Sequence, residues 1–499
     1  MIRKLLLVAS GFFIGALVTI TIPASSSKPE VTSSYAIDDL RKFATTLELI
    51  KKVYVQPVTD EKLITDAIGG MVSSLDPHSS YLDEATFKEI QIQTAGKFGG
   101  LGIEVSMDED GFVKVISPIE GSPADLAGVK AGDVIIKIDD MSVRGMKFSD
   151  AINKMRGEPK TKVTITISRK VDTTQEILTF PIIRDIINVT SVKSKLVEPG
   201  IIYLRLTQFQ ETTMEMMVDQ LNRLQKQGAV KGVILDLRNN PGGILEASIG
   251  VSAAFLNPDQ VVVSTDGRIP DVKSEMTADP KYYLNNTNDA DPIAKLDPVF
   301  KKVPIVVIVN SGSASASEIV AGALQDHRRA LIIGTKTFGK GSVQRLYPLI
   351  NNTAVKLTVA LYFTPNKRSI QAEGIAPDII VEDPALKTNF TIREADLQRH
   401  IDKPQNGDEK AAADTTKKEN TKPANATQKA EEAETNIICR PIDKKDQKRE
   451  PVRFGDPEDY QLQQAIKYLR TPGQFDKNGR PVIRPAAQKP AKEVTDKKA

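Results

Sequence analysis

Apolar residues recur at spacings of three and four through the segment that follows the N-terminal stretch. One series consists of Leu40, Phe43, Leu47, Ile50 and Val53, and a second of Ile64, Ile68, Met71 and Leu75. This period places the apolar residues on one face of a helix. The turn at Leu75-Asp-Pro-His-Ser-Ser-Tyr-Leu82 breaks it. The pattern predicts an N-terminal helical region over residues 34–95.

The pattern changes at Gly96, where short apolar runs alternate with Gly and Pro turns. Such runs are typical of strands. The expected strands are Gly102-Ile-Glu-Val105, Val113-Lys-Val-Ile116, Val134-Ile-Ile-Lys-Ile138 and Val163-Thr-Ile-Thr-Ile-Ser168. Residues 96–185 are therefore predicted to form a small β-rich domain.

Between residues 186 and 385, apolar strands alternate with helical patterns. The expected strands are 201–206, 232–237, 304–310, 330–334 and 355–362, and the expected helices are about 213–227, 245–256 and 316–326. Alternation of this kind argues for an α/β layered domain. The chain as a whole is predicted to be a multidomain α+β protein.

Apolar periodicity fades after about residue 386. Residues 401–450 contain 11 basic and 11 acidic residues, no aromatic residue and few aliphatic ones. Chains of this composition do not form a packed core. We expect a disordered linker over residues 386–455 and a flexible tail over 473–499. Cys439 lies in the linker, and we assign it no catalytic role.

The N-terminus has the pattern of an export signal. Met1-Ile-Arg-Lys4 is basic, residues 5–22 are largely apolar, and Pro23-Ala-Ser-Ser-Ser27 follows. This order is typical of secretory signals, although 18 apolar residues also suffice to span a bilayer. Residues 1–27 are interpreted as either a cleaved signal peptide or a retained membrane anchor, and both place the rest of the chain outside the cytoplasm.

Composition disfavours several functions. The 67 basic and 64 acidic residues leave a net charge of +3 over 499 residues, so bulk electrostatics do not favour a nucleic-acid partner. One cysteine permits no intramolecular disulfide, and three scattered histidines give no Cys/His metal site. We expect no metal and no cofactor.

A serine-rich turn joins the predicted strand 304–310 to the predicted helix 316–326. It reads Asn310-Ser-Gly-Ser-Ala-Ser-Ala-Ser-Glu318. A serine at the end of a strand and the start of a helix lies where free N–H groups favour developing negative charge. The same residues also fit a capping box, in which Ser315 and Glu318 only start the helix. Nucleophile and cap both remain open from this turn alone.

Two glycine-containing turns nearby could complete a catalytic site. Lys340 stands between Gly339 and Gly341, and glycines permit close backbone approach. Arg238-Asn-Asn-Pro-Gly-Gly243 follows the strand at 232–237, where Gly-Gly could direct N–H groups at an oxyanion or could form an ordinary tight turn.

Six motifs along the chain resemble those of the carboxyl-terminal processing (tail-specific) peptidases. One of them is a PDZ-like segment, which contains Gly99-Gly-Leu-Gly102 and Ser122-Pro-Ala-Asp-Leu-Ala-Gly-Val-Lys-Ala-Gly-Asp133. The others are residues 75–82, Leu235-Asp-Leu-Arg-Asn-Asn-Pro-Gly-Gly243, Gly312-Ser-Ala-Ser-Ala-Ser-Glu318, Thr337-Phe-Gly-Lys-Gly-Ser-Val-Gln344 and Ile370-Gln-Ala-Glu-Gly-Ile-Ala-Pro-Asp378. The resemblance covers about residues 35–385. It also implies a short C-terminal helix at 456–472 and a crotonase/ClpP-like protease core.

The resemblance implies a serine endopeptidase of the Ser/Lys type. Ser315 would be the nucleophile, Lys340 the general base and Gln344 the residue that orients the lysine. The oxyanion donors would be the N–H of Ala316 and that of Gly242 or Gly243. A lysine base must be neutral, so its pKa must fall by roughly three units from about 10.4, at a cost of about 4 kcal/mol. Burial can cause such a shift.

The PDZ-like domain implies how substrates are recognised. In PDZ domains a glycine loop binds a chain-terminal carboxylate while the peptide adds a strand to the sheet. Gly99, Gly100, Leu101 and Gly102 would form that loop here. The expected partners are proteins or peptides with exposed C-termini. The expected location is the bacterial periplasm or cell envelope. Membrane attachment through residues 5–22, an oligomer and an adaptor protein all remain open.

Three alternatives compete with this interpretation. Gly334-Thr-Lys-Thr-Phe-Gly-Lys340 fits a phosphate-binding loop, but Gly341 stands where Ser or Thr should bind magnesium. A non-catalytic PDZ scaffold would use only the peptide-binding domain. His78 could be a catalytic base, but a histidine in an Asp-Pro turn is more often structural.

Overall fold

The structure is a computed structural model that describes residues 37–107, 111–119, 121–171, 174–284, 286, 289–382, 392–404, 437–439 and 454–482. The predicted export signal at residues 1–27 lies outside these ranges. The chain divides into two compact units, one ending at Ile68 and the other beginning at Gly69. Within the described part, no helix is both long and apolar enough to cross a bilayer.

The predicted N-terminal periodicity corresponds to helices. They are α2 (Ile37–Val53), α3 (Asp60–Ser73) and α4 (Glu84–Ala95). In α2 the acidic Asp38 and Asp39 lie in the first turn and the basic Lys51 and Lys52 in the last. This arrangement of charge complements the helix dipole.

The β-rich region contains a six-stranded sheet of order β3-β4-β5-β7-β8, with β6 paired to β5. Its elements are β3 (Ile103–Met107), β4 (Val113–Pro118), β5 (Val134–Ile138), β6 (Met141–Ser142), β7 (Lys162–Val171), β8 (Thr174–Ile183), α5 (Pro123–Leu126) and α6 (Phe148–Met155). Beside it, β2 (Lys97–Gly100) pairs with β9 (Asp185–Asn188). The short strands expected from the sequence are all present.

A seven-stranded sheet forms the centre of the α/β region, in the order β10-β11-β12-β15-β16-β19-β20. Its strands are β10 (Val192–Glu198), β11 (Ile201–Leu206), β12 (Gly232–Asp236), β15 (Ile305–Val309), β16 (Leu331–Gly334), β19 (Ile379–Glu382) and β20 (Ile437–Cys439). All neighbours are parallel except β10 and β11. The carboxyl ends of β11, β12, β15 and β16 therefore meet along one edge.

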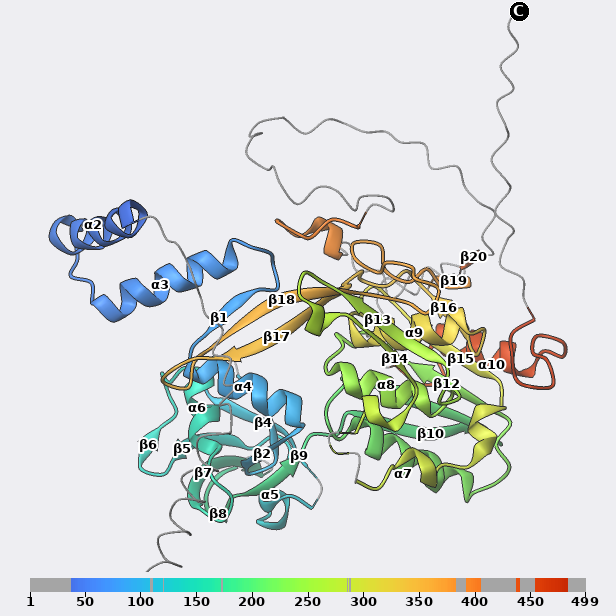
Figure 1. Cartoon of the computed structure of the whole chain (residues 1–499). Helices are drawn as coiled ribbons and strands as arrows, with labels where there is room; N and C mark the ends of the chain where they lie inside the picture. The colour runs from blue at the N-terminus through green and yellow to red at the C-terminus, as the bar shows by residue number, and fades with distance from the viewer. Residues whose placement is uncertain are drawn as a thin grey trace, which may run out of the picture. The chain divides into compact units, whose positions relative to one another are not determined.

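Helices cover both faces of this sheet (Figure 1). Helices α7 (Thr213–Gln225), α8 (Leu245–Ala253) and α9 (Ala316–Asp326) pack on one face, and α10 (Tyr460–Arg470) packs on the other. Every residue of β12 and β15 is buried, which explains why these strands are continuously apolar. Helix α10 lies within the range 456–472, where the resemblance implies a short C-terminal helix.

A second, five-stranded sheet has the order β1-β18-β13-β14, with β17 also paired to β18. Its strands are β1 (Ser80–Leu82), β13 (Val261–Asp266), β14 (Ser274–Thr277), β17 (Ser342–Pro348) and β18 (Ala354–Phe363). Short 3-10 helices are η1 (Pro270–Val272), η2 (Pro280–Tyr282), η3 (Ile293–Lys295), η4 (Pro298–Lys301) and η6 (Glu394–Asp396). The pairing of β1 with β18 brings residues 80–82 alongside residues 354–356.

The range predicted as a disordered linker contains two structured segments. Residues 392–404 include η6 and the fully buried Glu394, and β20 extends the parallel sheet at β19. Composition averaged over a long, largely polar segment does not reveal one buried carboxylate or one three-residue strand. Cys439 is the last residue of β20.

Candidate active site

The three serines of the 310–318 turn have different environments. The Ser313 hydroxyl donates to the Leu237 carbonyl (2.8 Å), and the Ser317 hydroxyl donates to the Asn240 carbonyl (2.9 Å). Both side chains are fully buried. Ser315, in contrast, lines a cavity of about 590 Å³. The structure thus distinguishes serines that spacing alone left equivalent.

Ser315 precedes α9 with an unusual backbone conformation. Its φ is 55° and its ψ is −115°, and positive φ is uncommon for a residue with a Cβ. The Glu318 carboxylate accepts the Ser315 N–H at 2.9 Å, and the Glu318 N–H donates to the Ser315 carbonyl at 2.8 Å. The side chain of Glu318 therefore starts the helix as the capping pattern predicted, and it also holds this strained residue in place.

Glu318 joins the serine turn to the lysine loop. One oxygen, Oε2, accepts the N–H of Ser315 and the N–H of Lys340, each at 2.9 Å. The other, Oε1, accepts Gly339 N–H at 2.7 Å and the Thr337 hydroxyl at 2.6 Å. Burial raises the pKa of Glu318 to about 7, although these four hydrogen bonds oppose the rise. A single buried carboxylate thus fixes the relation between the two backbone segments.

Lys340 lies on the loop between β16 and β17, close to several charged groups. Burial is the main reason that its pKa is lowered, and the positive charge of Lys356 lowers it further. The carboxylates of Glu394, Glu318 and Asp76 act in the opposite direction. Lys340 does not line the cavity that Ser315 lines. In the described part of the chain, no hydrogen bond joins the Lys340 side chain to Ser315.

Tyr362 lies between these two segments. Its hydroxyl donates to the Lys340 carbonyl, and its ring lines the cavity. Burial raises the Tyr362 pKa well above its ordinary value, while a hydrogen bond with the Ser315 side chain works against that rise. Tyr362 could not be identified from the sequence, because it continues an ordinary apolar strand pattern in β18.

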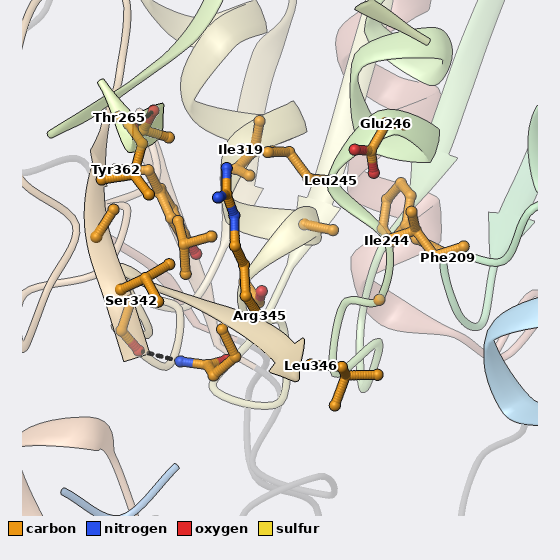
Figure 2. A pocket seen from close by; sticks show the side chains of 18 of the residues that line it. Phe209, Ile244, Leu245, Glu246, Thr265, Ile319, Ser342, Arg345, Leu346 and Tyr362 are labelled. Carbon is orange, nitrogen blue, oxygen red and sulfur yellow. Dashed lines mark hydrogen bonds between the residues drawn. The ribbon is translucent and has the colours of Figure 1, made fainter. Parts of the chain in front are cut away.

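Gln344 projects from β17 into the same cavity as Ser315. Its Nε2 donates to the Ser342 hydroxyl at 3.0 Å and to the Thr358 hydroxyl at 3.3 Å. The dashed line at Ser342 in Figure 2 marks the first of these bonds. The amide nitrogen of Gln344 therefore already donates hydrogen bonds to side chains of β17 and β18.

The Gly242-Gly243 turn lies against the start of α9. Both glycines have positive φ, 99° and 145°, and a Cβ on Gly242 would stand 2.7 Å from the Ser315 Cβ. The Gly242 N–H donates to Asn240 Oδ1 at 2.9 Å. Gly243 and Ala316 both line the cavity, and among the described residues their N–H groups have no hydrogen-bond partner. These two N–H groups are available to a bound ligand.

A buried ion network holds the chain just before this turn. The guanidinium of Arg238 is fully buried and bonds both Asp236 and Asp459. The closest contacts are 2.6 Å from Nη2 to Asp236 Oδ2 and 2.5 Å from Nη2 to Asp459 Oδ2. The ring of Phe454 lies 4.1 Å from the guanidinium carbon. Sequence reasoning missed this link because its partners are 221 positions apart.

The rest of the cavity wall is mixed in character (Figure 2). Phe209, Ile244, Leu245 and Ile319 contribute apolar surface, whereas Glu246 and Arg345 contribute charges. A wall that combines apolar surface with placed polar groups can bind the apolar and the polar parts of an organic ligand.

The predicted carboxylate loop is divided between a strand and a turn. Gly99 and Gly100 belong to β2 and pair with Ile186 and Asp185 of β9. Leu101 and Gly102 connect β2 to β3. Gly102 has φ 75°, and a Cβ there would stand 2.3 Å from the Ser122 Cβ, so this turn needs a glycine.

His78 does not line the cavity that contains Ser315. Its Nε2 bonds Glu394 Oε2 at 2.8 Å and Oε1 at 3.0 Å, and the Glu394 side chain is fully buried. The histidine is therefore paired with a carboxylate, in accord with its expected structural role. The loop from 334 to 340 leads into strand β17 and not into a helix, so the phosphate-binding-loop alternative fails.

Comparison with known proteins gives matches along most of the chain. Residues 200–381 match peptidase family S41, residues 114–169 match the PDZ domain, and residues 8–86 match the N-terminal domain of the activating protease CtpB. An S41 core with a PDZ domain defines a serine-type peptidase that acts on peptide or protein substrates.

The chain belongs to the carboxy-terminal processing proteases of peptidase family S41. It is 44% identical over 416 residues to the carboxy-terminal-processing protease of Bartonella bacilliformis, covering 82% of this chain and 90% of that relative. It is 36% identical over 380 residues to the carboxy-terminal processing protease CtpA of Bacillus subtilis, covering 74% and 75%. Among solved structures it is similar to a photosystem II D1 C-terminal processing protease, with 29% identity, a TM-score of 0.38 and coverage of 69% and 86%.

Proposed function

We propose that this chain is an exported endopeptidase that uses Ser315 as nucleophile, Lys340 as general base and Gln344 to orient the lysine. Residues 96–185 would bind the C-terminal end of a substrate, and residues 186–385 would cleave it nearby. The observation that carries the proposal is the position of Ser315. It lines the cavity beside two N–H groups that have no hydrogen-bond partner among the described residues, while Ser313 and Ser317 are buried and hydrogen-bonded elsewhere.

The chemistry follows from these groups. Neutral Lys340 takes the proton of the Ser315 hydroxyl as the oxygen attacks the scissile carbonyl, and it returns the proton to the leaving amine. The oxyanion accepts hydrogen bonds from the N–H of Ala316 and of Gly243. Gly243 is preferred to Gly242 because the Gly242 N–H already donates to Asn240. Water then hydrolyses the acyl-enzyme by the same route.

The base requires a lysine that gives up its proton readily. Burial and the charge of Lys356 lower the pKa of Lys340 from its ordinary 10.5, so the neutral form is more abundant at any given pH than for an exposed lysine. Because only the neutral form accepts a proton, kcat/KM should rise with pH through this lowered pKa. The Lys340 amine must also reach Ser315, and Glu318 sets the distance between their backbones.

The test is cleavage of an unfolded protein with an apolar C-terminus by the purified full-length chain. Ser315→Ala and Lys340→Ala should each abolish cleavage while the thermal unfolding curve stays intact. Ser311→Ala and Lys336→Ala are matched controls, because they remove the same groups from the same two segments. Undiminished cleavage by Ser315→Ala or by Lys340→Ala would contradict the proposed Ser/Lys dyad.

Recognition of C-termini can be tested on the substrate side, which avoids damage to the glycine turn. We expect a peptide with a free C-terminal carboxylate to bind residues 99–102 through backbone N–H groups. The same peptide with an amidated C-terminus should be cleaved much more slowly. Equal rates for the two peptides would remove the proposed role of Gly99, Gly100, Leu101 and Gly102.

Export is proposed from the basic and apolar N-terminus, with the periplasm or cell envelope as the destination. Cell fractionation would test it. The full-length chain should be found in the envelope fraction, and a chain lacking residues 1–27 should be found in the cytoplasm. Identical distributions of the two chains would contradict export.

A further inference from the structure

The Asp76-Pro-His-Ser79 turn lies beside the strand that supports Gln344. Strand β1 pairs with β18, which brings Asp76 next to Thr358. The Asp76 carboxylate is 5% exposed and accepts four hydrogen bonds. They come from His78 N–H (2.8 Å), Ser79 N–H (3.0 Å), the Ser79 hydroxyl (2.6 Å) and the Thr358 hydroxyl (3.0 Å).

The donors around Asp76 keep it ionised. Burial raises its pKa, but the hydrogen bonds from Ser79, His78 and Thr358 outweigh burial, and the pKa lies below its ordinary value. An ionised carboxylate can only accept hydrogen bonds. The single hydrogen of the Thr358 hydroxyl must therefore point at Asp76. The oxygen of Thr358 is left as an acceptor for Gln344 Nε2, 3.3 Å away.

This chain of donors determines which way the Gln344 amide faces. With Nε2 directed at Thr358 and Ser342, Oε1 faces the opposite direction. An amide oxygen is an acceptor, and the amine of Lys340 offers N–H donors. Gln344 can then hold Lys340 by accepting one N–H, which leaves the nitrogen lone pair of the neutral amine for the Ser315 proton. A flipped amide would donate an N–H to the neutral amine and so occupy the lone pair that must accept the Ser315 proton.

A second chain starts at His78 and ends at the residue after Lys340. His78 bonds the buried Glu394 carboxylate, and Glu394 Oε1 accepts Gln371 Nε2 at 3.0 Å. The opposite end of that amide, Gln371 Oε1, accepts the Gly341 N–H at 2.9 Å. This series of hydrogen bonds resembles the one that begins at Asp76. In it, the Glu394 carboxylate orients the Gln371 amide, and the oxygen of that amide holds the backbone beside Lys340.

We infer that the Asp76–His78 turn is a positioning element for the general base, acting on the Gln344 side chain through Thr358 and on the Gly341 backbone through Glu394 and Gln371. This inference rests on the proposed roles of Lys340 and Gln344. Neither Asp76 nor His78 touches the reacting atoms. Their effect is to fix the direction of one amide and the path of one loop.

The sharpest test compares two substitutions at one position. Thr358→Val keeps the shape of the side chain and removes the hydroxyl that links Asp76 to Gln344, whereas Thr358→Ser keeps the hydroxyl. We expect kcat to fall roughly ten- to hundredfold in Thr358→Val with KM within about twofold, and to be largely restored in Thr358→Ser. Asp83→Asn is the matched control for Asp76→Asn, because Asp83 only caps α4.

A double-mutant cycle separates positioning from general stability. In the wild-type background, Asp76→Asn should lower kcat. In a Gln344→Ala background, Asp76→Asn should have little further effect on the residual labelling of Ser315 by a fluorophosphonate. The reason is that both substitutions break the same series of hydrogen bonds. Equal kcat for Thr358→Val and Thr358→Ser, or full additivity in the cycle, would overturn the inference. In the same assay, activity of Ser315→Ala or Lys340→Ala would instead overturn the proposed function.

Discussion

The two sides of Ser315 are built in different ways. On the oxyanion side, Gly243 follows β12, whose residues are all buried, and the Arg238 network ties the strand end to Asp459. On the base side, Lys340 lies on a loop whose neighbours are held by side-chain carboxylates and amides. A strand within a buried sheet fixes the first side by packing, whereas hydrogen-bond direction fixes the second. Perturbations of the first side should therefore appear mainly in stability, and those of the second mainly in kcat and its pH dependence.

The largest effect is expected on the oxyanion side. Arg238→Met removes the guanidinium that Asp236 and Asp459 share, and of its ion pairs Asp236 keeps the one with Arg205. Loss of one member of a buried ion pair costs about 3–5 kcal/mol. Urea unfolding should show a drop of this size in the free energy of unfolding. Arg223→Met on the surface of α7 is the control, because that guanidinium makes only exposed hydrogen bonds. A loss of less than about 1 kcal/mol in Arg238→Met would contradict a packing-based oxyanion side.

Glu318 joins the two sides, and its titration should affect stability. Its pKa rises from 4.5 to about 7 on folding, so between these values the folded protein binds more protons than the unfolded chain. The free energy of unfolding should therefore fall as pH rises from 4.5 to 7, by up to about 3 kcal/mol. Glu318→Gln should lack this fall, whereas the exposed Glu215→Gln should keep it. Parallel stability curves for wild type and Glu318→Gln would show that the carboxylate is not perturbed.

The serine turn offers a smaller test of the same division. Ser313→Ala removes the donor to the Leu237 carbonyl, and Ser317→Ala removes the donor to the Asn240 carbonyl. Each should lower the free energy of unfolding by about 1 kcal/mol, because a buried carbonyl loses one of its two donors and keeps a backbone N–H. Cleavage below the melting temperature should persist in both. Complete inactivity of folded Ser313→Ala or Ser317→Ala would argue that the nucleophile has been misassigned.

The smallest effect concerns the base side. The positive charge of Lys356 lowers the pKa of Lys340, so Lys356→Met should raise that pKa. Since neutral Lys340 is the active form, the acidic limb of the kcat/KM profile should move to higher pH, by less than about one unit. Lys367→Met, which removes a lysine that pairs with Glu275, should leave the limb in place. A shift to lower pH in Lys356→Met would contradict this electrostatic assignment.

The contrast between the two sides also explains what the sequence could predict. Continuous apolar runs predicted β12 and β15, and the glycines and serines at their ends marked Gly243 and Ser315, because strand ends and tight turns leave local patterns. Thr358, Gln371 and Glu394 left none. Each is a single polar residue whose role depends on a partner that folding brings close, as with Glu394 and His78, 316 positions apart. Glu394 even fell in a range expected to be disordered.

Sequence spacing also could not identify which serine is the nucleophile or which glycine is the oxyanion donor. Ser313, Ser315 and Ser317 alternate along one turn, and only the direction of each hydroxyl separates them. Gly242 and Gly243 differ in whether the N–H is already bonded within the turn. Both distinctions depend on backbone dihedrals, including φ 55° at Ser315, that no residue pattern specifies.

The most direct test of the central claim is the rate at which a fluorophosphonate labels the purified chain as a function of pH. Labelling should occur at Ser315 alone, and its rate should rise along a single titration whose midpoint lies below 10.5, the ordinary lysine pKa. Lys340→Ala should remove this titration and nearly all labelling, while Lys336→Ala should retain both. Labelling at Ser313 or Ser317, or an unchanged pH profile in Lys340→Ala, would contradict a serine activated by a neutral lysine.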